Sequence, residues 1–163
     1  MSIHPSRTVA LRLSVALIAA VGLVLALRSF AVSDGTAAAV FEAERMNISG
    51  STASVITDGS ATSGQAVTMQ SNGTIGTLAS LPAGKRLSIR AKATPCQGDA
   101  RMTVSLDGTQ VLSVGVGAKD WSNYSVAHDV APGDHALSIS FSNATTKGSC
   151  SRTLSIDSVS VMK

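Results

Sequence analysis

From residue 40 to the end of the chain, apolar and polar side chains alternate in short runs that are separated by turn residues. The alternation is clearest in segments 87–92, 137–141 and 154–159. A two-residue period gives a strand one buried and one solvated face, which is typical of antiparallel sheets packed in two layers. The sequence therefore predicts an all-β, two-layer antiparallel β-sandwich over residues 40–163, with a core of small aliphatic side chains.

Turn residues at intervals of about 8–12 residues divide this region into candidate strands. Asp107-Gly108 stands between two alternating runs and predicts a short hairpin. Pro132-Gly133-Asp134 marks another turn. The predicted strands are 40–45, 54–56, 66–69, 73–78, 86–93, 101–106, 109–116, 122–130, 135–141 and 153–162.

The first 33 residues have a different character. Residues 13–27 are uncharged and apolar and follow Arg7 and Arg12, which is the pattern of a signal peptide cleaved after Ser33. An uncleaved signal anchor is the alternative. We expect a hydrophobic targeting helix within residues 1–33 and a linker at 34–39. Either alternative implies a secreted or extracytoplasmic domain, anchored through residues 13–27 if the segment is retained.

The net charge of +3 originates in the targeting segment. Arg7, Arg12 and Arg28 supply it, and the ten remaining Lys and Arg residues are balanced by ten Asp and Glu residues. The chain also has only one Trp, one Tyr and three Phe for base stacking. A nucleic-acid-binding surface is therefore not expected.

Two cysteines, Cys96 and Cys150, lie outside the targeting segment. An even number of cysteines in an exported domain favours a disulfide. By restricting the unfolded chain, it would raise the free energy of unfolding by about 4 kcal/mol. Two buried free thiols are the alternative.

No set of residues for hydrolysis is evident. The sequence lacks a G-x-S-x-G elbow, and His128 and His135 are expected to be surface or turn-packing residues on either side of Pro132. Glu42 and Glu44 are two residues apart on a predicted strand and should share a face. Such a pair suits calcium, which prefers carboxylate oxygens, although a solvated acidic strand face fits the spacing equally well.

The ends of the domain resemble carbohydrate-binding modules of families 6, 35 and 36. The resemblance lies in Phe41-Glu42-Ala43-Glu44 and in 154–159, whose sequence is LSIDSV. It implies a jelly-roll sandwich with a structural calcium held by Glu42, Glu44 and Asp157, and with main-chain carbonyls near Ser63-Gly64 as further ligands.

The middle of the domain is similar to the calcium-dependent xylan-binding modules of families 36 and 60. The similar segments include 87–93, 96–98, 106–111, 121–124, 132–137 and 150–154. The resemblance covers residues 41–161 and implies a disulfide between Cys96 and Cys150.

One departure from these families concerns a second calcium that binds sugar. Their F-x-N-D and C-D-R-N-L segments supply two carboxylates to it, and here Ala144 and Ser151 stand at those positions. Loss of two anionic ligands would weaken such a site strongly. Polar and aromatic loop residues could contact a sugar instead, although Trp121 and Tyr124 also fit a framework role. The candidates are Asp99, Asp120, Trp121, Tyr124, Asn143 and Arg152.

These observations favour a non-catalytic, monomeric exported module that binds a polysaccharide such as xylan or a cell-surface glycan. The alternative is a structural or adhesion sandwich at the cell surface that has lost the sugar-binding calcium. An enzyme is the third possibility. Contact with a membrane is expected only through an uncleaved N-terminal segment.

Overall fold

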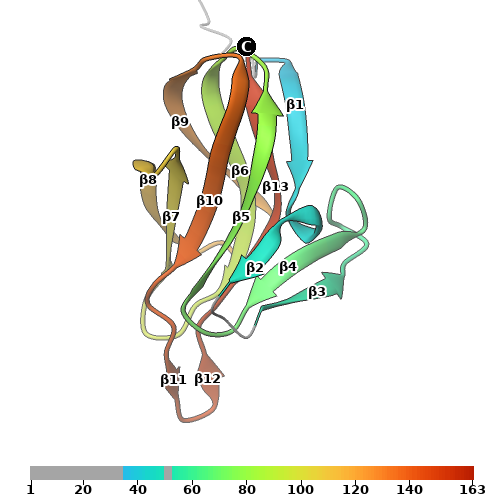
Figure 1. The fold of residues 1–163 in the computed structure, drawn as a ribbon. Helices are drawn as coiled ribbons and strands as arrows, with labels where there is room; N and C mark the ends of the chain where they lie inside the picture. The colour runs from blue at the N-terminus through green and yellow to red at the C-terminus, as the bar shows by residue number, and fades with distance from the viewer. Residues whose placement is uncertain (1–34, 50–52) are drawn as a thin grey trace, which may run out of the picture. The chain divides into compact units, whose positions relative to one another are not determined.

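The alternating runs form strands along the whole domain (Figure 1). The structure, a computed structural model, describes residues 35–49 and 53–163. One short 3-10 turn, η1 (Ala43–Arg45), interrupts them. The strands are β1 (Ala37–Glu42), β2 (Asn47–Ser49), β3 (Ala53–Thr57), β4 (Gln65–Met69), β5 (Gly73–Leu81), β6 (Gly84–Thr94), β7 (Ala100–Leu106), β8 (Thr109–Val116), β9 (Ser122–Val130), β10 (Gly133–Phe141), β11 (Thr146–Lys147), β12 (Cys150–Ser151) and β13 (Thr153–Met162).

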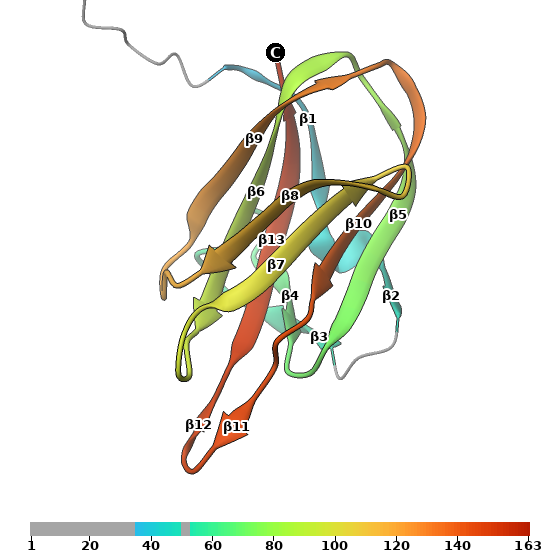
Figure 2. The same ribbon diagram turned by 90° about the vertical axis from the view of Figure 1, so that its left-hand side faces the viewer.

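The strands make two main antiparallel sheets that face each other (Figures 1 and 2). The first has the order β3-β4-β13-β6-β9, with β1 also paired to β13, and the second has the order β2-β5-β10-β7-β8. Strands β11 and β12 form a small separate hairpin. The predicted all-β antiparallel fold is confirmed. The targeting helix expected within residues 1–33 lies outside the described residues.

The core between the sheets is aliphatic, as the alternation predicts. Leu87, Ile89 and Ala91 of β6 are fully buried and face Leu137 and Ile139 of the other sheet across the core. The polar residues between them on each strand are more exposed. Phe141 is the largest fully buried side chain. Burial of apolar surface on the inner faces of both sheets is the main contribution to the stability of the folded domain.

A bulge in β13 changes which residues face the core. Leu154 and Ile156 are buried before it, and Val159 and Val161 after it, so Asp157 is the extra residue. Residues before the bulge pair with β4, and residues after it pair with β1. The bulge therefore places a carboxylate where three strands meet.

The predicted hairpin at Asp107-Gly108 is present between β7 and β8. Both residues have positive φ, 53° and 77°. This backbone matches the twist of the flanking strands and explains the Asp-Gly sequence.

The beginning of the domain differs from the prediction. Strand β1 begins at Ala37, inside the segment 34–39 that we expected to be a linker, and it ends at Glu42. Glu44 lies in η1, so the two glutamates do not share one strand face. Strands β2, β11 and β12 were also not predicted. In the described ranges, no helix is long and apolar enough to cross a membrane.

Candidate metal and ligand sites

Three carboxylates approach one another at the junction of β1, η1 and β13. Glu42 is the last residue of β1 and pairs with Ser158, directly after the bulge residue Asp157. Glu44 follows in η1 because Ala43 and Met46, three residues apart, both turn into the core. The fold therefore brings together the three predicted calcium ligands.

The two glutamates have unsatisfied acceptor atoms. Glu42 Oε2 and Glu44 Oε2 are buried and have no hydrogen-bond partner among the described residues. The hydroxyl of Ser63 donates to Glu44 Oε1 at 2.7 Å. Burial raises the pKa of Glu42, and the negative charges of Glu44 and Asp157 raise it further. Buried carboxylate oxygens without donors fit a calcium ion, which prefers oxygen ligands.

Asp157, in contrast, has a full set of partners. Its side chain is completely buried, and both of its oxygens accept from Thr62, at 2.8 to 3.2 Å. Arg90 adds an ion pair through Nη1. Within residues 35–49 and 53–163, no three Asp, Glu, His or Cys side chains are arranged to hold a metal. Only the glutamates present free oxygens, so the predicted three-carboxylate set is assembled in part.

The segment 58–64, between β3 and β4, folds over the carboxylate site. The Asp58 carboxylate forms an ion pair with Lys92 and accepts a hydrogen bond from the Ser60 amide. Both contacts lower the pKa of Asp58. Arg90 donates to the Ser60 carbonyl at 3.1 Å. We define this segment, Asp58 to Gly64, as the carboxylate loop.

Trp121 is part of the same arrangement. Its indole nitrogen donates to Ser60 Oγ at 3.1 Å. Lys92 Nζ lies 4.5 Å and the Arg90 guanidinium carbon 5.4 Å from the ring centroid, distances at which cations are attracted to an indole face. In this structure Trp121 fixes the carboxylate loop against β6.

A second polar cluster lies at the end of the sandwich that carries the β6–β7 loop and the β11–β12 hairpin (Figures 1 and 2). Arg152 is only 8% exposed, and its guanidinium donates to four main-chain carbonyls. These belong to Cys96, Gln97, Gly98 and Asn143, at 2.5 to 3.0 Å. Every edge of the guanidinium fork is thus used within the protein.

Asn143 and the disulfide join the same loops. Asn143 Oδ1 accepts from the Arg101 amide at 2.7 Å, and its Nδ2 donates to the Asp99 carbonyl at 3.0 Å. Cys96 and Cys150 form a disulfide, as predicted. Asn143 and Arg152 therefore hold loops in place, and a direct contact between them and a sugar stays a prediction.

The remaining candidates occupy more varied positions. Asp99 is exposed, and its carboxylate lies against Gly117, where an added Cβ would be 2.5 Å from it. Asp120 is exposed, and its carbonyl accepts from Ser122. Tyr124 packs against the core as a framework residue. Asp99, Asn143 and Arg152 are thus brought together, whereas Trp121 and Tyr124 serve packing roles.

The two positions that differ from the sugar-binding calcium motif have neutral partners. The Ala144 amide donates to Asn72 Oδ1 at 2.8 Å. The Ser151 hydroxyl is 3.0 Å from the Thr146 hydroxyl. Neither position supplies a negative charge to the loops.

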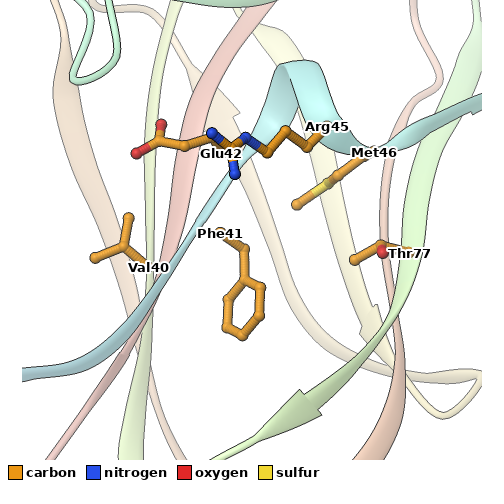
Figure 3. A pocket seen from close by; sticks show the side chains of 6 residues that line it. All are labelled: Val40, Phe41, Glu42, Arg45, Met46 and Thr77. Carbon is orange, nitrogen blue, oxygen red and sulfur yellow. The ribbon is translucent and has the colours of Figure 1, made fainter.

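A small pocket lies between β1 and β5 (Figure 3). Its volume is about 160 Å³, below the roughly 300 Å³ at which ligand pockets begin. The Phe41 ring points into the gap between the two strands, and Glu42 points away from that ring. The lining residues are Val40, Phe41, Glu42, Arg45, Met46 and Thr77. We assign no ligand to this pocket.

Sequence reasoning missed Arg90, Lys92, Thr62 and Ser60. Arg90 and Lys92 occupy the solvent-side positions of an alternating strand, where charged residues are common. Nothing in the pattern distinguishes them from solvated side chains. The family resemblance gave a partial signal, because it implied calcium ligands near Ser63-Gly64, which lie in the same segment as Ser60 and Thr62.

Comparison with known proteins shows one family that the C-terminal half of the chain resembles. Residues 86–163 match the family model described as a calcium-dependent, xylan-binding carbohydrate-binding module, family 60. This match supports a carbohydrate-binding module of this group. The matched part of the module includes the Arg152 cluster and the disulfide. No curated protein sequence matches the chain.

Solved structures share the fold of the module. A family 36 module in complex with calcium and xylotriose has a TM-score of 0.57 at 18% identity, covering 74% of this chain and 97% of the other. A family 36 domain of a xylanase from the hindgut metagenome of Trinervitermes trinervoides has a TM-score of 0.60 at 13% identity, covering 77% and 96%. A family 35 module from Clostridium thermocellum has a TM-score of 0.55 at 17% identity, covering 76% and 95%.

His135 connects two turns at the opposite end of the module. Its Nδ1 lies 2.6 Å from Asp107 Oδ2, and its Nε2 lies 3.0 Å from the Ala131 carbonyl. Because both partners are acceptors, the imidazolium satisfies both contacts. The hydrogen bond to Asp107 raises the pKa of His135, and the charge of nearby Asp134 adds to this.

The module should therefore lose stability as His135 deprotonates. A raised folded-state pKa means that the contribution is complete below about pH 6.5 and disappears as pH rises through the folded pKa. We expect the difference in melting temperature between wild type and His135→Gln to shrink between about pH 5.5 and about pH 8.5. His128→Gln, on β9, is the control. A constant difference for His135→Gln would contradict the assignment.

Proposed function

We propose that this module is a non-catalytic polysaccharide-binding module that acts outside the cytoplasm and recognises a glycan such as xylan. The match of residues 86–163 to the xylan-binding family model carries this proposal. The similar family 36 module was solved with xylotriose and calcium. The disulfide is consistent with an oxidising compartment.

We place the sugar at the end of the module that holds the Arg152 cluster. Arg152, Asn143 and the disulfide fix the loops there, which lowers the entropy lost when a ligand binds. Asp99 is exposed beside Asn143 and offers a carboxylate to sugar hydroxyls. Arg152 and Asn143 are then positioning residues in this proposal.

We also propose a structural calcium at Glu42 and Glu44. The two buried, unpartnered carboxylate oxygens support it. When bound, the ion would neutralise these charges and hold the end of β1 to the carboxylate loop. It would lie at the junction with β13, apart from the loops to which the sugar is assigned.

A structural or adhesion role is the second candidate. The neutral residues at Ala144 and Ser151 favour it, because they remove the two carboxylates that the sugar-binding calcium motif supplies. On this alternative the sandwich would keep its fold without retaining a glycan.

Affinity electrophoresis through gels that contain xylan tests the proposal. We expect the purified module to be retarded by xylan, and Asp99→Ala to reduce the retardation several-fold. Arg101→Ala, an exposed change on the adjoining strand, should leave it unchanged. The same gels with EDTA show whether a metal contributes.

Migration equal to that in a gel without polysaccharide, for xylan and for a panel of other glycans, would refute the binding function and favour the structural role. Wild-type retardation of Asp99→Ala would remove Asp99 as a sugar contact and would contradict the placement of the sugar at this end.

A further inference from the structure

The guanidinium of Arg90 lies among the carboxylates that we assign to calcium. We propose that Arg90 is a built-in counter-cation, which competes with a divalent metal for Asp157 and thereby sets the metal affinity of the site. This inference rests on the calcium proposed above, and it concerns a residue to which the family resemblance gave no role.

The hydrogen bonds around Asp157 support the competition. Asp157 is completely buried, and its Oδ2 accepts from Arg90 Nη1 and from the Thr62 hydroxyl. A carboxylate oxygen that already accepts two donors has little capacity left for a metal. Asp157 Oδ2 can bind a metal only if Arg90 releases it.

The charges at the site also differ in how well they are neutralised. Glu42, Glu44 and Asp157 are three acidic groups, and Arg90 is the only basic group that forms an ion pair with them in the described part of the chain. The oxygens that remain without donors are on the two glutamates. A divalent ion could neutralise those two, but it would repel the guanidinium that neutralises the third.

Arg90 has other contacts that would remain after it leaves Asp157. Its Nη2 donates to the Ser60 carbonyl at 3.1 Å, and its guanidinium lies over the Trp121 ring. The ion pair with Asp157 can therefore open without leaving the guanidinium unpartnered.

Arg90→Gln tests the inference. Gln keeps a polar side chain but removes the charge, so Asp157 becomes available and the repulsion disappears. We expect the dissociation constant for calcium, measured by isothermal titration calorimetry on protein stripped with EDTA, to fall about tenfold or more. The rise in melting temperature on adding calcium should be larger than in wild type.

Arg86→Gln is the matched control. Arg86 is on the same strand and, four residues away, on the same face, and it forms no ion pair with the described residues. This change should leave the calcium affinity at the wild-type value. If Arg90→Gln folds only with metal, refolding as a function of calcium concentration gives the same comparison.

The outcomes separate the inference from the proposal beneath it. An unchanged or weaker affinity in Arg90→Gln would overturn the competition, because Arg90 would then position Asp157 or be neutral. Equal tightening in Arg86→Gln would overturn it too, as a general charge effect. Binding by Arg90→Gln but not by wild type would sustain the inference and refute the native calcium. Binding by neither would refute both.

Discussion

Replacing Cys96 and Cys150 together by alanine is expected to lower the free energy of unfolding by about 4 kcal/mol. The disulfide spans 54 residues, and opening it restores the conformational freedom of that long segment in the unfolded chain. For a domain of this size the loss corresponds to roughly 15 °C in melting temperature. Thermal denaturation followed by circular dichroism measures it.

Reduction provides the internal control for this prediction. Wild type in excess reductant should melt close to the double variant, and reductant should leave the variant unchanged. Alanine is chosen because Cys96 is buried, where a serine hydroxyl would need a partner. A change of less than about 1 kcal/mol would show that the disulfide contributes little.

Arg152→Ala is expected to destabilise the module by about 3 to 5 kcal/mol. The substitution leaves four carbonyls without the donor that they share, and at least part of this set is buried. Arg152→Lys should fall between alanine and wild type, because an ammonium cannot reproduce the planar fork. Urea denaturation measures all three proteins.

Arg101→Ala is the control for Arg152, since it removes an exposed arginine near the same loops and should change stability by no more than about 0.5 kcal/mol. If Arg152→Ala changed the stability equally little, water would have to replace the guanidinium as the donor to the loop carbonyls. The effects of Arg152 and the disulfide should not add, because Arg152 binds the carbonyl of Cys96 itself.

The sequence predicted the long strands well because each has one face in the core. Strand β6 shows the reason: its buried residues Leu87, Ile89 and Ala91 alternate with polar ones. Strand β2 gave no such signal, because all three of its residues are exposed. A strand that forms only by pairing with a neighbour leaves no mark in the hydrophobic pattern.

The strand predicted across Glu42 and Glu44 was wrong, whereas calcium binding by these residues stays a prediction. Alternation in Phe41-Glu42-Ala43-Glu44 resembles a strand, but the chain turns after Glu42. Ala43 and Met46 are both buried and lie three residues apart, which is the period of a 3-10 turn. In a four-residue motif, two- and three-residue periods cannot be distinguished with confidence.

The loop residues show a different limit of sequence reasoning. Asn143 and Arg152 are polar residues in loops, and this pattern also fits sugar contacts. Their partners lie on segments up to 56 residues away, so only the tertiary fold reveals that the guanidinium is occupied by carbonyls. Trp121 is similar, because its partner Ser60 is 61 residues distant.

Strand β13 has a consequence for the order in which the module can form. Its ten residues pair with β6 along one edge and with β4 and β1 along the other. β13 is thus the centre of a sheet whose other strands all precede it in the chain. Folding of that sheet must wait until β13 has been synthesised, and contacts so distant in sequence form slowly. A truncation that removes this strand would leave three others without their partner.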